Sequence, residues 1–307
     1  MFKYDDLIVI SDKKDRKYLL TLKEGERFST NYGFIEHDHI IPLEEGDTVK
    51  SSQNHDYLVY KPTYMDYVMN IKRQAQIIYP KDAAVMLMWG DIGPNQKVLE
   101  SGIGQGALSI AILRALGDTG SLTSYEIRED FASQSANFIK KYFGKTPDNH
   151  RIEVRSIYNG IDDTFDRILL DLPEPWEVVP HLEKGLKNGG VIVAYIPTVL
   201  QVKNFVESLK ATKLFSDIET AEFTRRPWKV DGLSIRPEMW IYSHSAFIVS
   251  ARKLKPFADI SSRQKNKMKA QEKIQEKIDN KKLNDNEEQV VADDSNFLMN
   301  SKSFEEE

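Results

Sequence analysis

Hydrophobic and polar residues alternate in short runs along the first 65 positions, which is the pattern of small β-strands. The runs are rich in β-branched residues and are separated by Gly or Asp. We therefore expect a small all-β domain over residues 1–65. Helical periodicity follows in residues 66–96. The strand runs are DLIVISD, KYLLTLK, GFIEHDHIIPLEEGD and YLVYKP, and the helical ones are YMDYVMNIKRQAQ and KDAAVMLMWG.

From Lys97 onward, short apolar runs alternate with longer helical segments. Strands spaced by helices predict an α/β domain with a mostly parallel, doubly wound sheet and helices on both faces. We assign this domain to residues 66–254. Ligands of such sheets bind beyond the carboxyl ends of the strands, where the strand order reverses. The predicted strands are KVLE, SLTSYEI, IEVRS, DRILLD, VIVAYIP, FSDIETAEF and SAFIVSARK, and GALSIAILRAL and EDFASQSANFIKKYF are helices.

Composition narrows the classes of function. The 307 residues include no cysteine, which excludes disulfides, thiolate catalysis and cysteine zinc sites. The start MFKYDDLIVI lacks the pattern of a signal peptide, and no apolar run approaches the ~20 residues of a membrane span. We expect a cytoplasmic protein. A formal net charge of −5 does not exclude a nucleic-acid partner, because a local basic groove is enough to bind RNA.

Residues 255–307 form a charged tail with few apolar positions, and we expect it to be disordered or an exposed helix. Its basic stretch, residues 263–282, could steer RNA electrostatically, or it could be a solvated tail without a partner. The sequence leaves both interpretations open.

A glycine-rich turn joins a predicted strand to a predicted helix in VLESGIGQGALS, residues 98–109. Gly102, Gly104 and Gly106 let the backbone turn sharply and let a ligand approach it. Such a loop could serve a dinucleotide or S-adenosylmethionine. Glu100 before the loop would oppose a pyrophosphate but suit the ammonium of a methionine moiety, and Glu126 after the second strand could bind ribose hydroxyls. The acids favour the sulfonium cofactor; a purely structural turn is the alternative.

LLDLPEPWEV, residues 169–178, places Asp171 at the exit of a buried strand. We expect Pro173 and Pro175 to exclude helix and strand and to keep the following loop extended. A carboxylate beside the flat face of Trp176 could recognise an extruded adenine. If Asp171 accepts from the N6 amine, it stabilises the positive charge that develops when N1 is methylated. Alternatively, Asp171 caps a helix and Trp176 is packed.

These blocks resemble the tRNA (adenine-N1)-methyltransferases that modify adenosine 58 of the T-loop, the bacterial and archaeal TrmI type. The resemblance covers residues 1 to about 254. It rests on QIIYPKD, VLESGIGQGAL, SYEIREDFA, LLDLPEPWEV, YIPTVLQV, the RRPW segment and RPEMWIYSHSAF. It implies a class I methyltransferase fold behind the small β domain, S-adenosylmethionine as cofactor, tRNA as partner and a homotetramer, without membrane or metal. It leaves open whether adenosine 57 is also methylated.

The resemblance also assigns roles to residues. Asp171 matches the catalytic aspartate, and Tyr79, which lies in a segment near cofactor and target base, is the second expected catalytic residue. Two positions depart from the family pattern: Ser156 stands where an acid binds the cofactor adenine, and Gln105 replaces a small serine. The cofactor-binding set is Gln76, Glu100, Ser101, Gly102, Gly104, Gln105, Gly106, Ala107, Leu108, Glu126, Ser156 and Asp171.

The RNA-binding set is Trp176, Arg225, Arg226 and Trp228. The two arginines and Lys229 around Trp228 form a basic–aromatic cluster that could contact phosphates and a base, and a solvated loop is the alternative.

The histidines of the sequence give weaker indications of a function. The pair His37 and His39 lacks a third metal ligand nearby, so we expect no metal there. His244 is expected to pack or to form hydrogen bonds. Two rival functions remain at this stage: a small-molecule N-methyltransferase, against which the β domain argues, and a non-catalytic tRNA-binding subunit, which would not need the glycine loop, Glu126 and Asp171.

Overall fold

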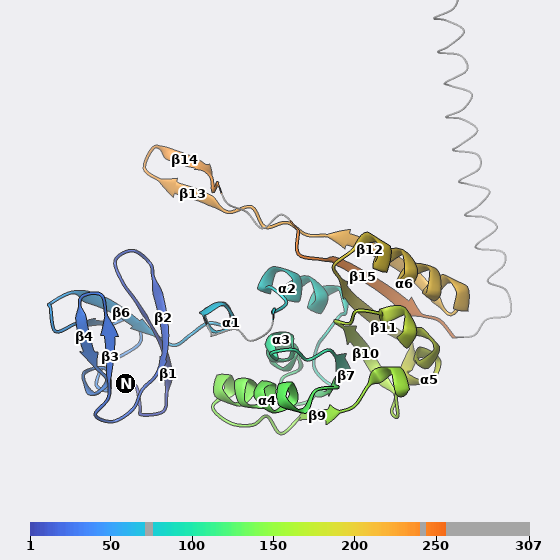
Figure 1. The fold of residues 1–307 in the computed structure, drawn as a ribbon, viewed down its shortest axis with the longest axis horizontal. Coiled ribbons are helices and arrows are strands. Elements are labelled where there is room, and N and C mark those ends of the chain that lie inside the picture. The colour runs from blue at the N-terminus through green and yellow to red at the C-terminus, as the bar shows by residue number, and fades with distance from the viewer. Residues whose placement is uncertain (71–75, 240–243, 256–307) are drawn as a thin grey trace, which may run out of the picture. The chain divides into compact units, whose positions relative to one another are not determined.

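A seven-stranded sheet forms the centre of the fold in the computed structural model, which describes residues 1–70, 76–239 and 244–255 (Figure 1). The strand order is β12-β15-β11-β10-β7-β8-β9. Neighbouring strands from β9 to β11 are parallel, and β15 is antiparallel to both of its neighbours. The strands are β7 (Lys97–Ser101), β8 (Ser121–Glu126), β9 (His150–Val154), β10 (Phe165–Leu170), β11 (Leu186–Ile196), β12 (Phe215–Glu222) and β15 (Phe247–Lys253).

The strand order reverses between β7 and β10. After β7 the chain builds β8 and β9 on one side, and it then crosses to β10 on the other side of β7. The register pairs Leu169 with Glu100 and Leu170 with Ser101. Asp171 therefore leaves the sheet beside the end of β7, and its backbone N–H donates to the Ser101 carbonyl at 2.9 Å. This is the edge at which doubly wound sheets bind their ligands.

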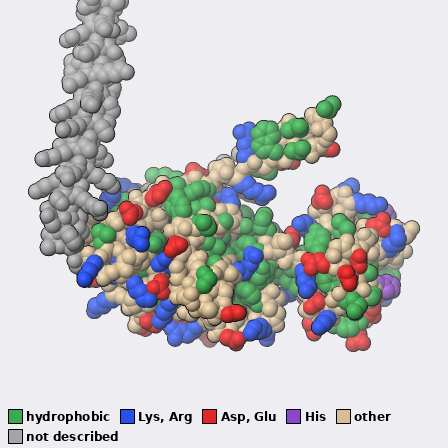
Figure 2. All heavy atoms as spheres, turned by 180° about the vertical axis from the view of Figure 1, so that it is seen from behind, with side chains coloured by type: hydrophobic (Ala, Val, Ile, Leu, Met, Phe, Trp, Pro, Cys, Tyr) green, Lys and Arg blue, Asp and Glu red, His purple; other side chains and the backbone are tan. Residues whose placement is uncertain are grey.

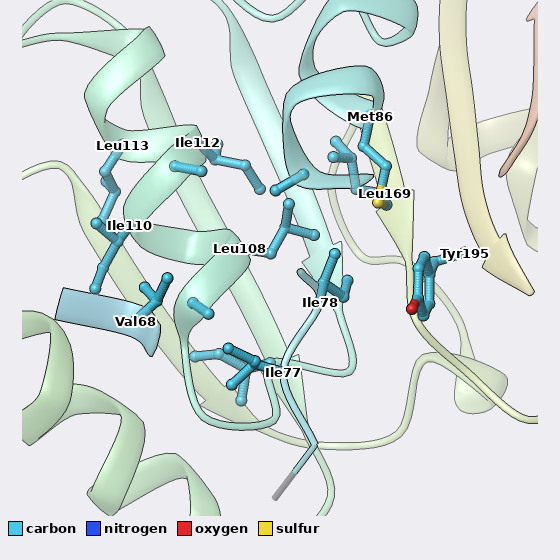
Figure 3. Packing of buried hydrophobic residues seen from close by; sticks show 14 of the residues in the cluster. Val68, Ile77, Ile78, Met86, Leu108, Ile110, Ile112, Leu113, Leu169 and Tyr195 are labelled. Carbon is cyan, nitrogen blue, oxygen red and sulfur yellow. The ribbon is translucent and has the colours of Figure 1, made fainter. Parts of the chain in front are cut away.

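Helices cover both faces of the sheet, as the alternating pattern predicts (Figure 1). One face buries a cluster that includes most of α3, together with Met86 of α2 and Leu169 of β10 (Figure 3). The other face buries a second cluster around Phe165 and Phe205. The doubly wound α/β prediction is confirmed. The first face carries α1 (Tyr64–Asn70), α2 (Pro80–Trp89), α3 (Ala107–Leu116) and α4 (Glu129–Phe143), and the second carries η3 (Pro175–His181), α5 (Leu182–Gly185) and α6 (Val199–Thr212); the 3-10 turn η2 (Ile157–Asn159) follows β9.

The N-terminal region is all-β, as expected, with a hydrophobic cluster of its own. It contains a four-stranded antiparallel sheet in the order β2-β1-β6-β5 and a separate pair, β3 with β4. Residues 1–255 form one compact unit, so the boundary at residue 65 stays a prediction. The strands are β1 (Leu7–Ser11), β2 (Lys17–Thr21), β3 (Arg27–Thr30), β4 (Gly33–Glu36), β5 (Thr48–Lys50) and β6 (Asp56–Tyr60).

The single strand predicted over GFIEHDHIIPLEEGD is wrong. Strand β4 ends at Glu36, and a 3-10 turn, η1 (His37–His39), follows it. His37 is buried, and its Nδ1 accepts from the backbone N–H of Lys23 at 3.0 Å. The histidine pair thus serves the local turn, and the described residues include no group of side chains suited to hold a metal ion.

A hairpin that was not predicted from the sequence lies between β12 and β15. It consists of β13 (Trp228–Asp231) and β14 (Ser234–Pro237), which form a two-stranded sheet separate from the other described strands. Gly232 and Leu233 form the two-residue turn between the strands, with Gly232 at φ +53°, and glycine at the first position of such a turn is a local hairpin signal. Hydrophobic side chains gather on this hairpin and remain exposed (Figure 2).

Several predictions fall on residues outside the described ranges. They are the end of the helix predicted over YMDYVMNIKRQAQ, part of the RPEMWIYSHSAF block, and the tail beyond residue 255 with its basic stretch. Among the described residues, no helix combines the length and the apolar character that crossing a membrane requires.

Candidate cofactor-binding and active site

The glycine loop, residues 102–106, needs glycine for two separate reasons. Gly102, Gly104 and Gly106 adopt φ values of +89°, +53° and +85°, which L-residues rarely adopt. A side chain at Gly102 would also collide with the backbone oxygen of Asp171. The loop therefore lies directly against the end of β10, and it places the N-terminus of α3 beside the sheet edge.

Glu100, the last residue but one of β7, is a fully buried carboxyl group. Its Oε2 accepts from the hydroxyls of Ser109 at 2.6 Å and Ser124 at 2.8 Å. Its Oε1 is also buried, and no donor among the described residues reaches it. Burial raises the pKa of Glu100 to about 7, the two hydroxyls oppose the rise, and nearby carboxylates add to it. A buried oxygen without a donor can still accept a hydrogen bond from a cationic ligand.

Glu126 ends the neighbouring strand β8 and lines a cavity of about 300 Å³. Its side chain is buried, and Oε1 accepts from the backbone N–H of Arg128 at 3.1 Å. The described lining unites the glycine loop, the end of β8, the turn after β9 and the exit of β10. Its members are Ser101, Gly102, Gly104, Tyr125, Glu126, Ile127, Arg128, Arg155, Ser156, Ile157, Tyr158, Asp171, Leu172 and Pro173.

Asp171 lies at the end of this cavity nearest to β11. Burial raises the pKa of its carboxyl group to about 6, and no hydrogen bond or cation among the described residues offsets the rise. Glu174, and not Asp171, occupies the N-cap position of the 3-10 helix η3, so the alternative that Asp171 caps the helix after the loop is wrong. A half-buried carboxylate that caps no helix and faces a cavity is a candidate functional group.

The segment after Asp171 differs in part from the expectation. Helix η3 begins at Pro175, so the prediction that Pro175 excludes a helix is wrong. The first turn of a helix has N–H groups without intrahelical partners, and proline is tolerated there. Trp176 is half-buried and packs against the second core cluster. Its contact with RNA stays a prediction, and its packing is established.

The two positions that depart from the family pattern are half-buried. Ser156 lines the cavity, but its Oγ also accepts from the backbone N–H of Tyr158 at 3.2 Å and caps the turn η2. Gln105 lies in the glycine loop and outside the described lining of the cavity. Six further candidates for cofactor binding or catalysis also lie outside the described lining. Gln76 is exposed, Tyr79 stands at the N-cap position of α2, and the other four, which are buried, are Glu100, Gly106, Ala107 and Leu108.

The candidate RNA-binding arginines, Arg225 and Arg226, are exposed just before the hairpin, and Trp228 is 56% exposed at its first position. The hairpin is thus accessible, although nothing in its geometry selects RNA over another partner. His244, at the other end of the hairpin segment, lies between Glu222 Oε1 at 2.6 Å and the Pro197 carbonyl at 2.9 Å. His244 forms hydrogen bonds and its ring also packs beside that of Phe247, in line with the expectation of packing or hydrogen bonding.

Sequence reasoning missed residues at the β11 side of the site. Tyr195 is the last residue but one of β11. The register pairs Leu170 of β10 with Ala194 of β11, so the next residues along these parallel strands, Asp171 and Tyr195, lie beside each other. Lys81 and Asp82 stand inside the QIIYPKD block but were not singled out. Only the packing of distant segments brings them to this edge, and the local pattern gives no signal for it.

Comparison with known proteins shows to which family the chain belongs. The family model described as "tRNA methyltransferase complex GCD14 subunit" matches residues 56–299, and a model described as "TrmI-like N-terminal" matches residues 1–49. The chain belongs to this family. A relative from Methanocaldococcus jannaschii, a tRNA (adenine(57)-N(1)/adenine(58)-N(1))-methyltransferase, is 32% identical over 82% of this chain and 95% of its own.

Two further comparisons support membership of the GCD14/TrmI family. The tRNA (adenine(58)-N(1))-methyltransferase TrmI of Thermus thermophilus is 30% identical over 81% of this chain and 97% of its own. The crystal structure of a SAM-dependent O-methyltransferase from Thermotoga maritima matches with a TM-score of 0.80 and 28% identity, over 84% of this chain and 96% of that one. The named relatives are methyltransferases, and the expected class I methyltransferase fold is confirmed.

Proposed function

We propose that this protein transfers a methyl group from S-adenosylmethionine to N1 of adenosine 58 in the T-loop of tRNA. One observation carries the proposal: a cavity at the switch point of the sheet contains Glu126 at one end and Asp171 at the other, with the glycine loop between them. Family membership supplies the RNA substrate class.

The residues present fit the proposed cofactor. Glu100 offers a buried oxygen without a donor among the described residues, which suits the ammonium of the methionine moiety. Glu126 offers carboxylate oxygens to ribose hydroxyls, and Ile127 and Ile157 add apolar surface to the lining for a purine ring. When bound, S-adenosylmethionine supplies a methyl group activated by a sulfonium charge.

Asp171 acts on the target base in this proposal. Adenine N1 has a free lone pair, so no base needs to remove a proton before attack. The Asp171 carboxylate accepts a hydrogen bond from the N6 amine and stabilises the positive charge that N1 acquires. Because the carboxylate stands in a partly water-excluded place, this electrostatic effect is stronger than it would be in water. Orientation of the extruded base supplies the rest.

The direct experiment uses an unmodified tRNA transcript and a methyl-labelled donor, followed by mass spectrometry of the nucleosides. We expect 1-methyladenosine at position 58, and the same map records whether position 57 is modified. Label on a small-molecule amine but not on tRNA would support the small-molecule rival. Binding of tRNA without any methyl transfer would support the non-catalytic rival.

Cofactor affinity should depend on pH through Glu100. Its pKa in the cofactor-free protein is about 7, above the ordinary value, so the carboxylate that an ammonium needs is lost as pH falls below 7. Binding of S-adenosylhomocysteine, which carries the same ammonium, should weaken roughly tenfold between pH 7.5 and pH 6 and release a proton. Calorimetry measures both effects, and Glu100→Gln should remove the pH dependence. A flat profile in the wild-type protein would place the ammonium elsewhere.

We also propose that the protein assembles into a homotetramer through its hairpin. The hairpin segment exposes Val230, Leu233, Ile235 and Met239, each more than half accessible. A contiguous apolar surface of this kind is typical of an association site. Sedimentation of the full chain should give the mass of four copies, and Leu233→Glu combined with Ile235→Glu should reduce it. A wild-type monomer at micromolar concentration would overturn the assembly.

A further inference from the structure

A buried ionic cluster joins three distant segments beside the proposed site. Lys81 Nζ donates to Asp82 Oδ1 at 2.6 Å, to Ser245 Oγ at 2.6 Å and to the Phe223 carbonyl at 2.8 Å. Ser245 Oγ in turn donates to Asp82 Oδ2 at 2.8 Å. We call Lys81, Asp82 and Ser245 the clamp. It connects the first turn of α2 to the segments that flank the hairpin.

Burial of the two charges of the clamp has a large desolvation cost, so the clamp is a poor way to stabilise the fold alone. Asp82 is completely buried and the Lys81 side chain is only 16% exposed, so both charges lose most of their hydration. A buried ion pair of this kind often stabilises a fold no more than well-packed apolar residues would, but removal of one partner leaves an unpaired buried charge. The pair also contributes geometry, because three hydrogen bonds tie the start of α2 to residues 223 and 245.

Two tyrosines lie between the clamp and the proposed catalytic residue, Asp171. Tyr79, the N-cap of α2, lies two residues before Lys81. Tyr195 lies beside Asp171 by the register of β10 and β11. Burial raises the pKa of the Tyr195 hydroxyl, the charges of Asp82 and Asp171 add to the rise, and Ser245 acts in the opposite direction. Tyr195 is therefore close enough to both the clamp and Asp171 to interact electrostatically with their carboxylates.

Figure 3 shows the same region from the core side. Ile78 and Met86, from the segment that leads into α2 and from α2 itself, pack with Leu169 of β10. Tyr195 stands at the margin of this cluster, toward the carboxyl edge of the sheet. Movement of the start of α2 would thus shift the wall that supports Tyr195 and the residues next to Asp171.

We propose that Lys81, Asp82 and Ser245 are positioning residues for the methyl transfer, which lock the start of α2 and Tyr79 against Tyr195 so that the target adenine meets Asp171 in a fixed place. The proposal rests on the proposed function. None of the three lines the described cavity, so they act through the residues that they hold and not on the cofactor.

The chain offers a matched control at the other end of the same helix. Arg167, in the N-terminal half of β10, donates to the Gly90 carbonyl at 2.7 Å and pairs with Asp91 Oδ2 at 2.7 Å. Its side chain is 15% exposed, almost the same as that of Lys81. Arg167→Met therefore removes a basic side chain of similar burial from the C-terminal end of α2, although its partner Asp91 is 81% exposed whereas Asp82 is fully buried.

The experiment compares Lys81→Met, Ser245→Ala and Arg167→Met in single-turnover methylation of the tRNA transcript, with saturating donor. For each variant, the melting temperature and the calorimetric Kd for S-adenosylhomocysteine are also measured. We expect Lys81→Met to lower the rate roughly tenfold or more, because small misplacements near reacting groups have large effects. Ser245→Ala, which removes one hydroxyl, should lower it roughly threefold. Cofactor Kd should stay within about twofold.

The control and a rescue separate positioning from stability. Arg167→Met should lower the melting temperature and leave the rate within about twofold of the wild type. Lys81→Arg, which keeps the charge, should recover part of the lost rate. Equal rate losses in Lys81→Met and Arg167→Met, or full activity in both clamp variants, would overturn the clamp. If Lys81→Met fails to fold, Ser245→Ala decides alone. A wild-type protein that does not methylate tRNA would overturn the proposed function first, and the clamp's role with it.

Discussion

Asp171→Ala is expected to lower the rate of methyl transfer by roughly 10²–10³-fold, the usual effect of removing one group that stabilises transition-state charge. Asp171 is the carboxylate that leaves β10 at the switch point, and its pKa of about 6 keeps it mostly ionised at neutral pH. Rapid-quench kinetics with saturating donor and tRNA isolates the chemical step. The calorimetric Kd for S-adenosylhomocysteine should change little.

Two companion measurements sharpen this result. Asp171→Asn keeps the shape and an acceptor oxygen but removes the charge, so its rate should fall between those of the wild type and Asp171→Ala. In the wild type the rate should decline as pH drops through about 6, because the carboxyl group becomes protonated. An Asp171→Ala variant that turns over at the wild-type rate would remove Asp171 from the mechanism.

Gly102→Ala should abolish cofactor binding and destabilise the fold. The residue adopts φ +89°, and its added Cβ would collide with the backbone oxygen of Asp171, so the glycine loop and the end of β10 must separate. Backbone strain alone costs about 1–3 kcal/mol. The displacement of two adjoining parts of the cavity adds the functional loss. Calorimetry with S-adenosylhomocysteine and thermal unfolding measure the two effects.

Gly144→Ala is the matched control for this substitution. Gly144 ends α4 at φ +74°, and a Cβ there would meet nothing within 4 Å. It therefore reports the backbone strain without the collision, and it should lower the melting temperature moderately while cofactor affinity is kept. Similar behaviour of the two variants would show that the close approach of Gly102 to Asp171 does not matter.

The sequence predicted those parts of the site that local position determines. Glu100, Glu126 and Asp171 each end a predicted strand, and parallel strands present their carboxyl ends at one edge. Alternation of strands and helices was therefore enough to bring the three acids together. The strand order itself, with β7 next to β10, came from packing and was not needed for that inference.

The remaining features depend on contacts that no local pattern encodes. The clamp joins Lys81 and Asp82 to Ser245, more than 160 positions away. The hairpin β13–β14 did have a local signal at Gly232, but its described hydrophobic side chains are exposed, so the pattern of a half-buried strand does not predict it. The helix at Pro175 was missed because proline was taken as a helix breaker, although it is tolerated in a first turn.

The role of Asp171 can be tested most directly with a tRNA transcript that carries purine in place of adenine at position 58. Purine retains N1 but lacks the N6 amine that the carboxylate is proposed to bind. We expect the wild-type protein to methylate this transcript much more slowly than the adenine transcript, and Asp171→Ala to show a much smaller difference between the two. Equal sensitivity of the wild type and Asp171→Ala to loss of the amine would contradict a hydrogen bond between Asp171 and the target base.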